Sequence, residues 1–311
     1  MSKKKNKSEV ATESKEVKPS WDGKLSYSSF STYMSCARKY YLGKVKRVPI
    51  DDDTEEDTLA LRYGKAFHKL LEDSMHDVSK VKGSNIKAAC AEFELDFETV
   101  GPQLVGQLRH YRKIRNQQDG LSVVKCEVQV LTPTFRGFID VVFKDKNGWW
   151  IGDLKTASSF SQHLLSKLKT DWQLNLYSYH VKEIAAALNL DPEEFRGCRY
   201  LLNVKTKLKR GAAETFSEYS DRCEYSQAAY DIAVEASEMA PETIYNIFSM
   251  IKVEIDFLHK AKKPEVAERR AVPNFTACTN YFKACEYWSN CHGGKFTELR
   301  SRKYLSSREE V

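Results

Sequence analysis

Carboxylate and amino side chains on two predicted strands are the first indication of chemistry in this sequence. Asp140 lies in an apolar run, Gly-Phe-Ile-Asp-Val-Val-Phe, that would bury it in a sheet, where a carboxylate needs a cation. Asp153 and Lys155 lie two residues apart in the next such run, so they point to the same face. A hairpin connection would bring Asp140 beside that face. The set predicts phosphodiester hydrolysis, because carboxylates bind Mg²⁺ or Mn²⁺, the ion activates water, and a lysine positions or deprotonates the nucleophile.

The Asp-x-Lys triplet is common, and a surface ion pair on a hairpin explains it as well, so the elements around it matter. Alternation of apolar and polar residues predicts an antiparallel meander of three strands, and a fourth strand further along the chain. Helical spacing predicts several helices around this sheet. The predicted strands cover residues 122–132, 136–144, 149–154 and 198–207, and the predicted helices cover 25–43, the segment opened by the acidic run 51–57, 84–115, 171–188 and, as one or two helices, 226–260.

The order of these elements predicts one α/β (α+β) domain over residues 25–311, with a mixed sheet of about four to five strands flanked by helices. No internal repeat or low-complexity linker divides it. Residues 1–24 are rich in Lys, Ser and Glu with almost no large apolar groups. They cannot bury enough surface to offset chain entropy, which predicts a disordered basic tail.

Four motifs occur in a specific order: Gly64-x-x-x-His68, Gly137-Phe138-Ile139-Asp140, Asp153-Leu154-Lys155 and Gln173-x-x-x-Tyr177. Together they resemble the RecB-like branch of the PD-(D/E)XK nuclease superfamily. The resemblance implies a restriction-endonuclease-like core and DNA as substrate. It also implies that His68, Asp140 and Asp153 hold the metal, that Lys155 is catalytic, and that the Gln-x-x-x-Tyr motif lies on the helix after the core strands.

Further residues extend this predicted site. Gln173 and Tyr177 lie four apart on one helical face, so they can contact a DNA backbone or brace the site together. Glu127 has the parity of a residue facing the metal, and related enzymes often carry an acidic residue near this place. Lys205 and Lys207 alternate along the fourth strand and can contact phosphate, although a solvated strand face explains them equally well.

Three of the eight cysteines, Cys278, Cys285 and Cys291, lie in a short aromatic-rich segment, and three thiolates suggest a fourth ligand. Iron–sulfur nucleases of the branch, the CRISPR-associated and AddB-type enzymes, place one cysteine upstream of the nuclease motifs, and Cys36 matches that place. The resemblance therefore implies a [4Fe-4S] module made of residues 273–294 and Cys36. The six residues between Cys278 and Cys285 depart from the commonest spacing, and a Zn²⁺ site with the same thiolates, or with His292 replacing one, satisfies the same ligand chemistry.

Composition bounds the function. The formal charge of +6, from 49 basic and 43 acidic residues, is a mild excess that suits a polyanionic partner. The apolar runs are shorter than a membrane span and the first residues lack a signal core, so we expect a cytoplasmic protein. The sequence contains no Walker A motif, so we expect no fused helicase motor.

These observations predict a metal-dependent DNA nuclease, and more specifically an exonuclease on ends or single strands. Because no base-reading module is visible, sequence-specific cleavage is not expected. We expect the enzyme to act in recombination, repair or replication, with other proteins of those processes as partners. The compact chain is also in keeping with a phage origin. Two alternatives stay open: a CRISPR-adaptation nuclease, and a non-catalytic nucleic-acid-binding subunit that keeps the fold.

Overall fold

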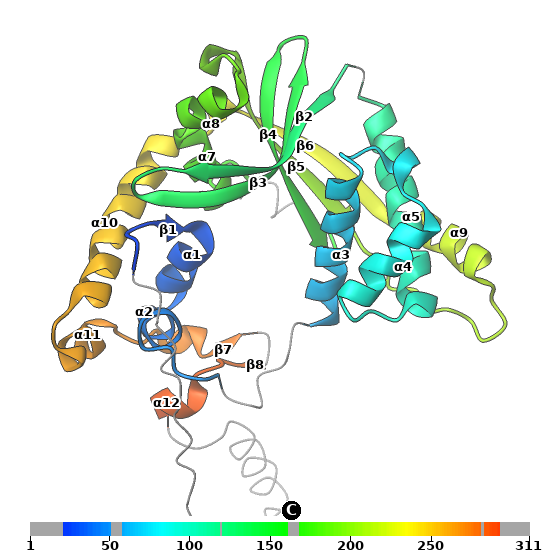
Figure 1. The fold of residues 1–311 in the computed structure, drawn as a ribbon. Helices are drawn as coiled ribbons and strands as arrows, with labels where there is room; N and C mark the ends of the chain where they lie inside the picture. The colour runs from blue at the N-terminus through cyan, green and yellow to red at the C-terminus, as the bar shows by residue number, and fades with distance from the viewer. Residues whose placement is uncertain (1–20, 51–57, 119, 161–167, 281–282, 293–311) are drawn as a thin grey trace, which may run out of the picture.

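The computed structural model describes residues 21–50, 58–118, 120–160, 168–280 and 283–292. In these residues a mixed sheet of six strands is flanked by helices on both faces (Figure 1), and a second, two-stranded sheet lies near the C-terminal end. The predicted fold class is confirmed, with six strands where about four to five were expected. Most of the predicted tail and the acidic run 51–57 lie outside the described residues.

The strands of the main sheet are β1 (Leu25–Ser26), β2 (Ser122–Leu131), β3 (Phe135–Asp145), β4 (Gly148–Ala157), β5 (Phe195–Val204) and β6 (Ala228–Glu235), and those of the small sheet are β7 (Thr279–Asn280) and β8 (Lys283–Ala284). The α-helices are α1 (Tyr27–Ser35), α2 (Ala37–Tyr40), α3 (Leu59–Asp73), α4 (Gly83–Glu92), α5 (Phe97–Asn116), α7 (Trp172–Tyr179), α8 (Val181–Leu188), α9 (Phe216–Ser226), α10 (Pro241–Lys260), α11 (Pro264–Arg270) and α12 (Trp288–His292). A π-helix (Tyr41–Lys46) continues α2, and short 3-10 turns join other elements.

Strand β3 pairs with three other strands. Its first edge pairs along most of its length with β2, antiparallel. Its second edge is divided: β1 pairs parallel at Phe135 and Arg136, whereas β4 pairs antiparallel only from Val141 onward. Residues 137–140 of β3 have no strand partner on that edge. The sheet continues from β4 to β5, which run parallel, and then to the antiparallel β6.

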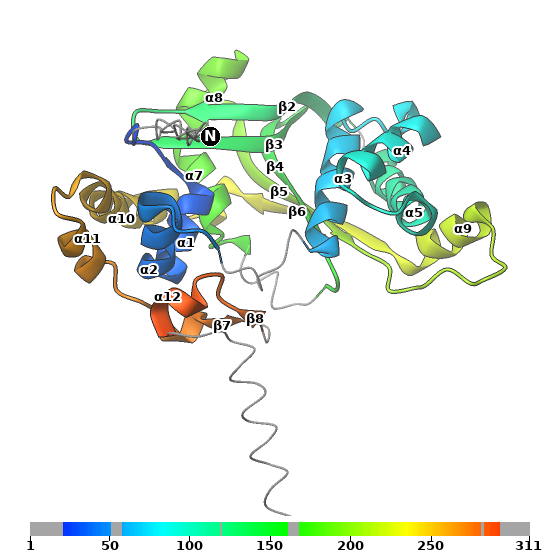
Figure 2. The same cartoon turned by 60° about the horizontal axis from the view of Figure 1, so that its bottom comes forward.

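Two hydrophobic cores lie on the two faces of this sheet. One contains residues of α1, α7, α8 and α10 together with Trp149 and Ile151 of β4. The other contains residues of α3, α4 and α5 together with Trp150 and Leu154 of the same strand. Figure 2 shows the two groups of helices on opposite sides of the strands. Because alternate residues of β4 enter different cores, β4 is buried on both faces.

Several predicted elements differ from the structure. The predicted helical segment 84–115 is two helices, α4 and α5. Residues 226–260 were expected to be helical, but Ala228–Glu235 forms the strand β6, and Pro241 begins α10 at the first helical turn. Tyr230, Ile232 and Val234 of β6 alternate with Asp231, Ala233 and Glu235, so the strand pattern is present, but it is short and is flanked by alanines that favour helix. The predicted helix 171–188 is two helices, α7 and α8, which meet at the buried His180. Among the described residues, no helix is long and apolar enough to cross a bilayer.

Trp21, inside the predicted tail, packs against the domain. Its indole lies parallel to the His259 ring of α10 with 4.2 Å between centroids, and its Nε1 donates a 2.8 Å hydrogen bond to Asp256 Oδ1. Tyr40 also contacts the ring of His259, because its hydroxyl lies 3.0 Å from His259 Nε2. Trp21 therefore belongs to the folded domain and not to the predicted tail, because its large aromatic side chain has partners on α10.

We expect Trp21→Ala to lower the free energy of unfolding by about 1–2 kcal/mol, since it removes buried aromatic area, a stacked pair and a hydrogen bond. Trp21→Phe, which keeps a ring but not the Nε1 donor, should lose less. Urea unfolding followed by circular dichroism measures both variants. An Ala variant as stable as the wild type would show that this contact does not anchor the segment.

Candidate active site

Helix α3 brings His68 to the sheet through a close approach at Gly64. Thr58 caps the helix by accepting a hydrogen bond from the Leu61 amide. A Cβ atom at position 64 would lie 2.9 Å from Thr156 Oγ1 of β4, so any larger residue would force the threonine side chain or the helix to move. One turn later, His68 Nδ1 lies 3.8 Å from Asp140 Oδ2. Burial lowers the pKa of His68, which favours the neutral imidazole that binds metals.

Asp140 lies where β3 and β4 separate. Its Oδ2 accepts a 2.7 Å hydrogen bond from the backbone amide of Leu154, a group that β3 leaves without a ladder partner. The carboxylate therefore bridges the two strands beyond their last pair, Val141 and Gly152. Burial raises the pKa of Asp140 despite this hydrogen bond.

Asp153 and Lys155 point to the same face of β4, as predicted from their spacing. Asp153 is 3% exposed, and its Oδ1 accepts a 2.8 Å hydrogen bond from Lys155 Nζ. Its other oxygen, Oδ2, is buried without a hydrogen-bond partner among the described residues. Burial raises the pKa of Asp153 to about 6 although Lys155 opposes this shift. For Lys155 burial acts against the charged form, but the carboxylates of Asp153 and Asp140 outweigh it and raise the pKa of the amine.

Helix α7 contacts Lys155 of this pair through Gln173. Asp171 caps the helix, and Gln173 Oε1 accepts a 3.2 Å hydrogen bond from Lys155 Nζ. The Tyr177 hydroxyl donates a 2.6 Å hydrogen bond to the carbonyl of Phe138, within the part of β3 that lacks a second strand partner. Tyr177 is only 3% exposed. Of the two roles predicted for the Gln-x-x-x-Tyr motif, this geometry favours bracing the site for Tyr177 over contact with DNA.

Two glutamates complete the acidic group. Glu127 on β2 is exposed and has a positive φ of 47°. Partial burial, followed by the charges of Asp140 and Glu72, raises its pKa to about 7, so these carboxylates are near one another. Glu72 was not among the predicted site residues. Its position one turn after His68 on α3 was the available signal, but that spacing alone does not show which strand the helix faces.

An open pocket of about 660 Å³ lies beside these residues. His68, Glu72 and Lys155 line it, together with residues of α3, the end of β4 and Lys205. Strand β5 ends at Val204, so Lys205 and Lys207 follow the strand and do not lie on it. Lys205 Nζ donates to the carbonyl of Ala60 and lies over the Tyr63 ring, whereas Lys207 is exposed and outside the pocket lining.

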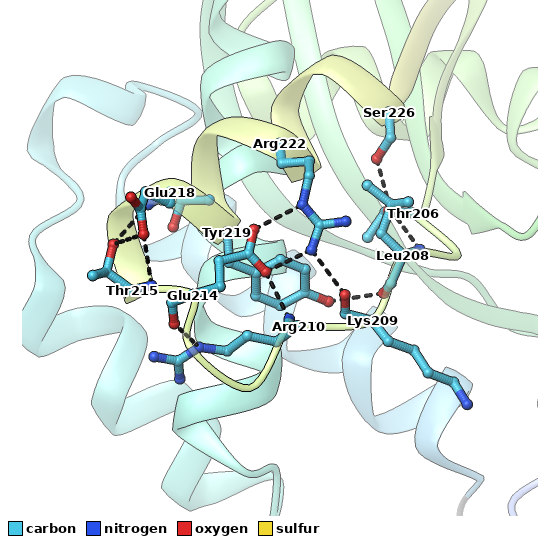
Figure 3. A network of polar contacts seen from close by, with 12 residues as sticks. Thr206, Leu208, Lys209, Arg210, Glu214, Thr215, Glu218, Tyr219, Arg222 and Ser226 are labelled. Carbon is cyan, nitrogen blue, oxygen red and sulfur yellow. Dashed lines mark hydrogen bonds and ion pairs between the residues drawn. The ribbon is translucent and has the colours of Figure 1, made fainter.

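The segment after Lys205 is held by a polar network, shown in Figure 3. Arg222 of α9 donates to Glu214 and to the carbonyl of Lys209. Tyr219 of the same helix donates a 2.8 Å hydrogen bond to the carbonyl of Leu208. These contacts fix the path of the chain from β5 to α9, and with it the place of Lys205 at the rim of the pocket.

The four cysteines of the predicted module line a second, enclosed pocket of about 10 Å³, as Cys36, Cys278, Cys285 and Cys291. Cys36 Sγ accepts hydrogen bonds from the amides of Lys39 and Asn274, so it lies between α2 and the C-terminal segment. His292 Nε2 lies 3.3 Å from Cys278 Sγ. Cys90, Cys126, Cys198 and Cys223 are buried elsewhere.

In the part of the chain that the structure describes, no three His, Cys, Asp or Glu side chains stand at the mutual spacing of a formed metal site. At the carboxylates, Lys155 Nζ and the Leu154 amide take one oxygen each of Asp153 and Asp140. The donor types suit a hard divalent cation at the carboxylates and a thiophilic ion at the cysteines. The unpartnered Asp153 Oδ2 is the sharpest sign that a cation belongs at the first site.

Comparison with known families identifies this arrangement. The sequence profile of the PD-(D/E)XK nuclease superfamily matches residues 24–292. The chain belongs to the PD-(D/E)XK nuclease superfamily. No curated protein matches the chain. The match spans both the carboxylate site and the cysteine pocket.

We expect Gly137→Ala to reduce the stability of the protein by about 1–3 kcal/mol, because the new methyl group would lie 2.8 Å from the Tyr177 ring. Displacing that ring should also disturb the Phe138 carbonyl beside Asp140. Gly83→Ala, where nothing lies within 4 Å of the added methyl, is the matched control. Urea unfolding of the two variants tests this expectation, and equal stabilities would contradict it.

Proposed function

We propose that the protein is a DNA nuclease that uses Mg²⁺ or Mn²⁺ to hydrolyse phosphodiester bonds. The observation that carries the proposal is the convergence of Asp140, Asp153, His68 and Lys155, with one buried carboxylate oxygen left without a partner. A buried anionic oxygen is costly unless a cation or a donor meets it. Nuclease membership makes a divalent cation the fitting partner.

Each residue has a distinct proposed role. Asp140 and Asp153 would hold the cation through their oxygens, His68 through its neutral imidazole, and Glu127 would add an oxygen from β2. When bound, the cation lowers the pKa of a bound water and neutralises charge on the scissile phosphate. Lys155, fixed by Asp153 and Gln173, places a positive Nζ beside the reacting phosphate. Tyr177 keeps β3 in position behind Asp140.

The pocket supports a nucleic-acid strand as substrate. Lys65, Lys69 and Lys205 stand among its lining residues beside Lys155, which suits a phosphate backbone. Lys207 and Gln173 would add contacts further along the strand. We propose an exonuclease that acts on DNA ends or single strands in recombination, repair or replication, together with other proteins of these processes. A CRISPR-adaptation nuclease is the enzymatic alternative, and a DNA-binding subunit without catalysis is the alternative from another class.

We expect Asp153→Ala and Lys155→Ala to lower cleavage of labelled single- and double-stranded DNA in Mn²⁺ by about 100-fold or more. The first variant lacks a proposed ligand of the cation, and the second lacks the positive charge beside the reacting phosphate. Asp221→Asn, on the exposed surface of α9, should cleave as the wild type does. Gel assays that follow both strands also give polarity. Equal cleavage by Asp153→Ala and the wild type would refute the proposed site, and DNA binding without cleavage would favour the non-catalytic alternative.

We also propose that Cys36, Cys278, Cys285 and Cys291 hold a structural metal centre. Four thiols around one enclosed pocket suit either a [4Fe-4S] cluster or Zn²⁺. The small volume suits a single ion directly, whereas a cluster requires the thiols to move apart. His292, next to Cys278, is the substitute ligand in the zinc form. Such a centre would tie the chain after α1 to the C-terminal segment and so stabilise the fold.

Metal analysis and absorption spectra of anaerobically purified protein distinguish iron–sulfur from zinc. We expect Cys285→Ser to lose the bound metal and to lower the free energy of unfolding by about 2 kcal/mol or more. Cys90→Ala, a buried thiol outside this pocket, should keep the metal content of the wild type. A metal-free wild type, or a Cys285→Ser variant with full metal content, would contradict the centre.

A further inference from the structure

An exposed aromatic side chain stands two residues before Asp140 on β3. Phe138 is 54% exposed, although it stands in the apolar run that contains Asp140. The next residue, Ile139, is buried in the core of α1, α7 and α10. Phe138 therefore points away from that core. Asp140, on the other side of Ile139 in the sequence, has its carboxylate 3.8 Å from His68 of α3, a helix of the opposite core. The distance between the Cα atoms of Phe138 and Asp140 along the strand is roughly 7 Å.

A change of face in the β2–β3 pair accounts for this exposure. Cys126 packs in the core of α3 and α5, whereas Val128, two residues later, packs in the opposite core. On β3, Val141 and Ile139 change cores in the same way. Glu127, with its positive φ, lies at the switch. Beyond it the hairpin presents residues on a face that the α3 and α5 core no longer covers.

The exposed face forms rows that lead away from the metal-binding carboxylates. Gln129 pairs in register with Phe138, and Leu131 pairs with Arg136. Leu131 is 55% exposed, and the Arg136 side chain is 50% exposed although it pairs with Asp22. The face thus offers an aromatic ring, an amide, an aliphatic group and a guanidinium within two rows of Asp140. An apolar ring flanked by polar and cationic groups is the combination that binds unstacked bases beside a phosphate backbone.

We propose that Phe138 is a base-stacking residue, and that the exposed face of Gln129, Leu131, Arg136 and Phe138 binds the nucleotide next to the scissile phosphate in a single strand or frayed end. The inference rests on the proposed function, since it takes DNA as the substrate of the carboxylate site. The exposed face adjoins the carboxylate site on the same strand, which favours DNA as its ligand. When a phosphate of a DNA strand lies at Asp140, the base next to that phosphate must lie on one side of the site, and this face is one of those sides. Stacking tolerates any base, which agrees with cleavage that does not depend on sequence.

The test is equilibrium binding of a single-stranded phosphorothioate oligonucleotide, which resists cleavage, with 2-aminopurine placed in turn at each position near an end. In the wild type, we expect strong fluorescence quenching at one position or two adjacent positions, because stacking quenches this base. Phe138→Ala should abolish that position-dependent quenching and weaken binding by about 5-fold or more. Phe138→Trp, which keeps a ring, should restore both, and an unchanged thermal midpoint in each variant excludes loss of the fold as the cause.

Tyr225→Ala is the matched control, because Tyr225 is an 88% exposed aromatic on α9, a helix that lies apart from strands β3 and β4 in Figure 1. It should bind and quench as the wild type does. Binding and quenching by Phe138→Ala equal to those of the wild type would overturn the inference. If the wild type quenches at a defined position but never cleaves natural DNA in Mn²⁺, the proposed nuclease function fails while the base-stacking role stands.

Discussion

The divided edge of β3 is the constraint on which the site depends. Because β1 takes the start of this edge and β4 takes the end, residues 137–140 have no backbone partner there. Unpaired backbone groups inside a protein must find other partners. Here the Tyr177 hydroxyl binds the Phe138 carbonyl, and the Asp140 carboxylate binds the Leu154 amide. The opening that places a carboxylate between two strands is thus also the reason why a buried tyrosine is needed behind it.

This opening brings the carboxylates of Asp140 and Asp153 together among buried groups. Asp140 and Asp153 are both pushed towards their protonated forms by burial, and Lys155 offsets only part of that cost. A ligand cation would lower the energy of both carboxylates at once, so the site is destabilised in a way that binding relieves. The glycine at position 64 and the cap at Thr58 serve the same end, because they let α3 bring His68 to within 3.8 Å of Asp140. The burial that makes these carboxylates unfavourable is therefore the same feature that would favour binding of a cation.

The cysteine pocket joins α2 to the C-terminal segment of β7, β8 and α12, elements that lie below the main sheet in Figure 2. The segments it joins are short: α2 has four residues, α12 has five, and β7 and β8 have two each. Such short elements bury little surface, so hydrophobic packing alone holds them weakly. Contacts such as the Asn274 amide to Cys36 Sγ, across 238 residues of sequence, carry the connection. A metal held by the four thiols would strengthen this junction and leave the carboxylate site unaltered.

Much of the site was predictable because its signals are local. Strand parity places Asp153 and Lys155 on one face, and helical spacing places Gly64 and His68 on one side of α3, whatever the rest of the chain does. The order of the motifs led to the superfamily that the sequence profile then showed. Strand β6 escaped prediction although Tyr230, Ile232 and Val234 alternate with polar or small residues, because this short pattern lies between alanine-rich segments that favour helix. The break at His180 escaped because both halves share helical spacing.

By itself, the sequence determined the residue types of the site, their order along the chain and the mixed α/β class, since each depends on spacing within a strand or helix. Only the tertiary structure decided that Glu72 faces the same carboxylates, that Tyr177 braces β3, and that Phe138 is exposed within an apolar run. It also brings Cys36 into one pocket with the three C-terminal cysteines, a grouping that the family resemblance implied and that no spacing in the chain shows by itself. The physical reason is the same in each case: these outcomes depend on which edges of β3 find partners and on how helices distant in sequence pack, and no local pattern contains that information.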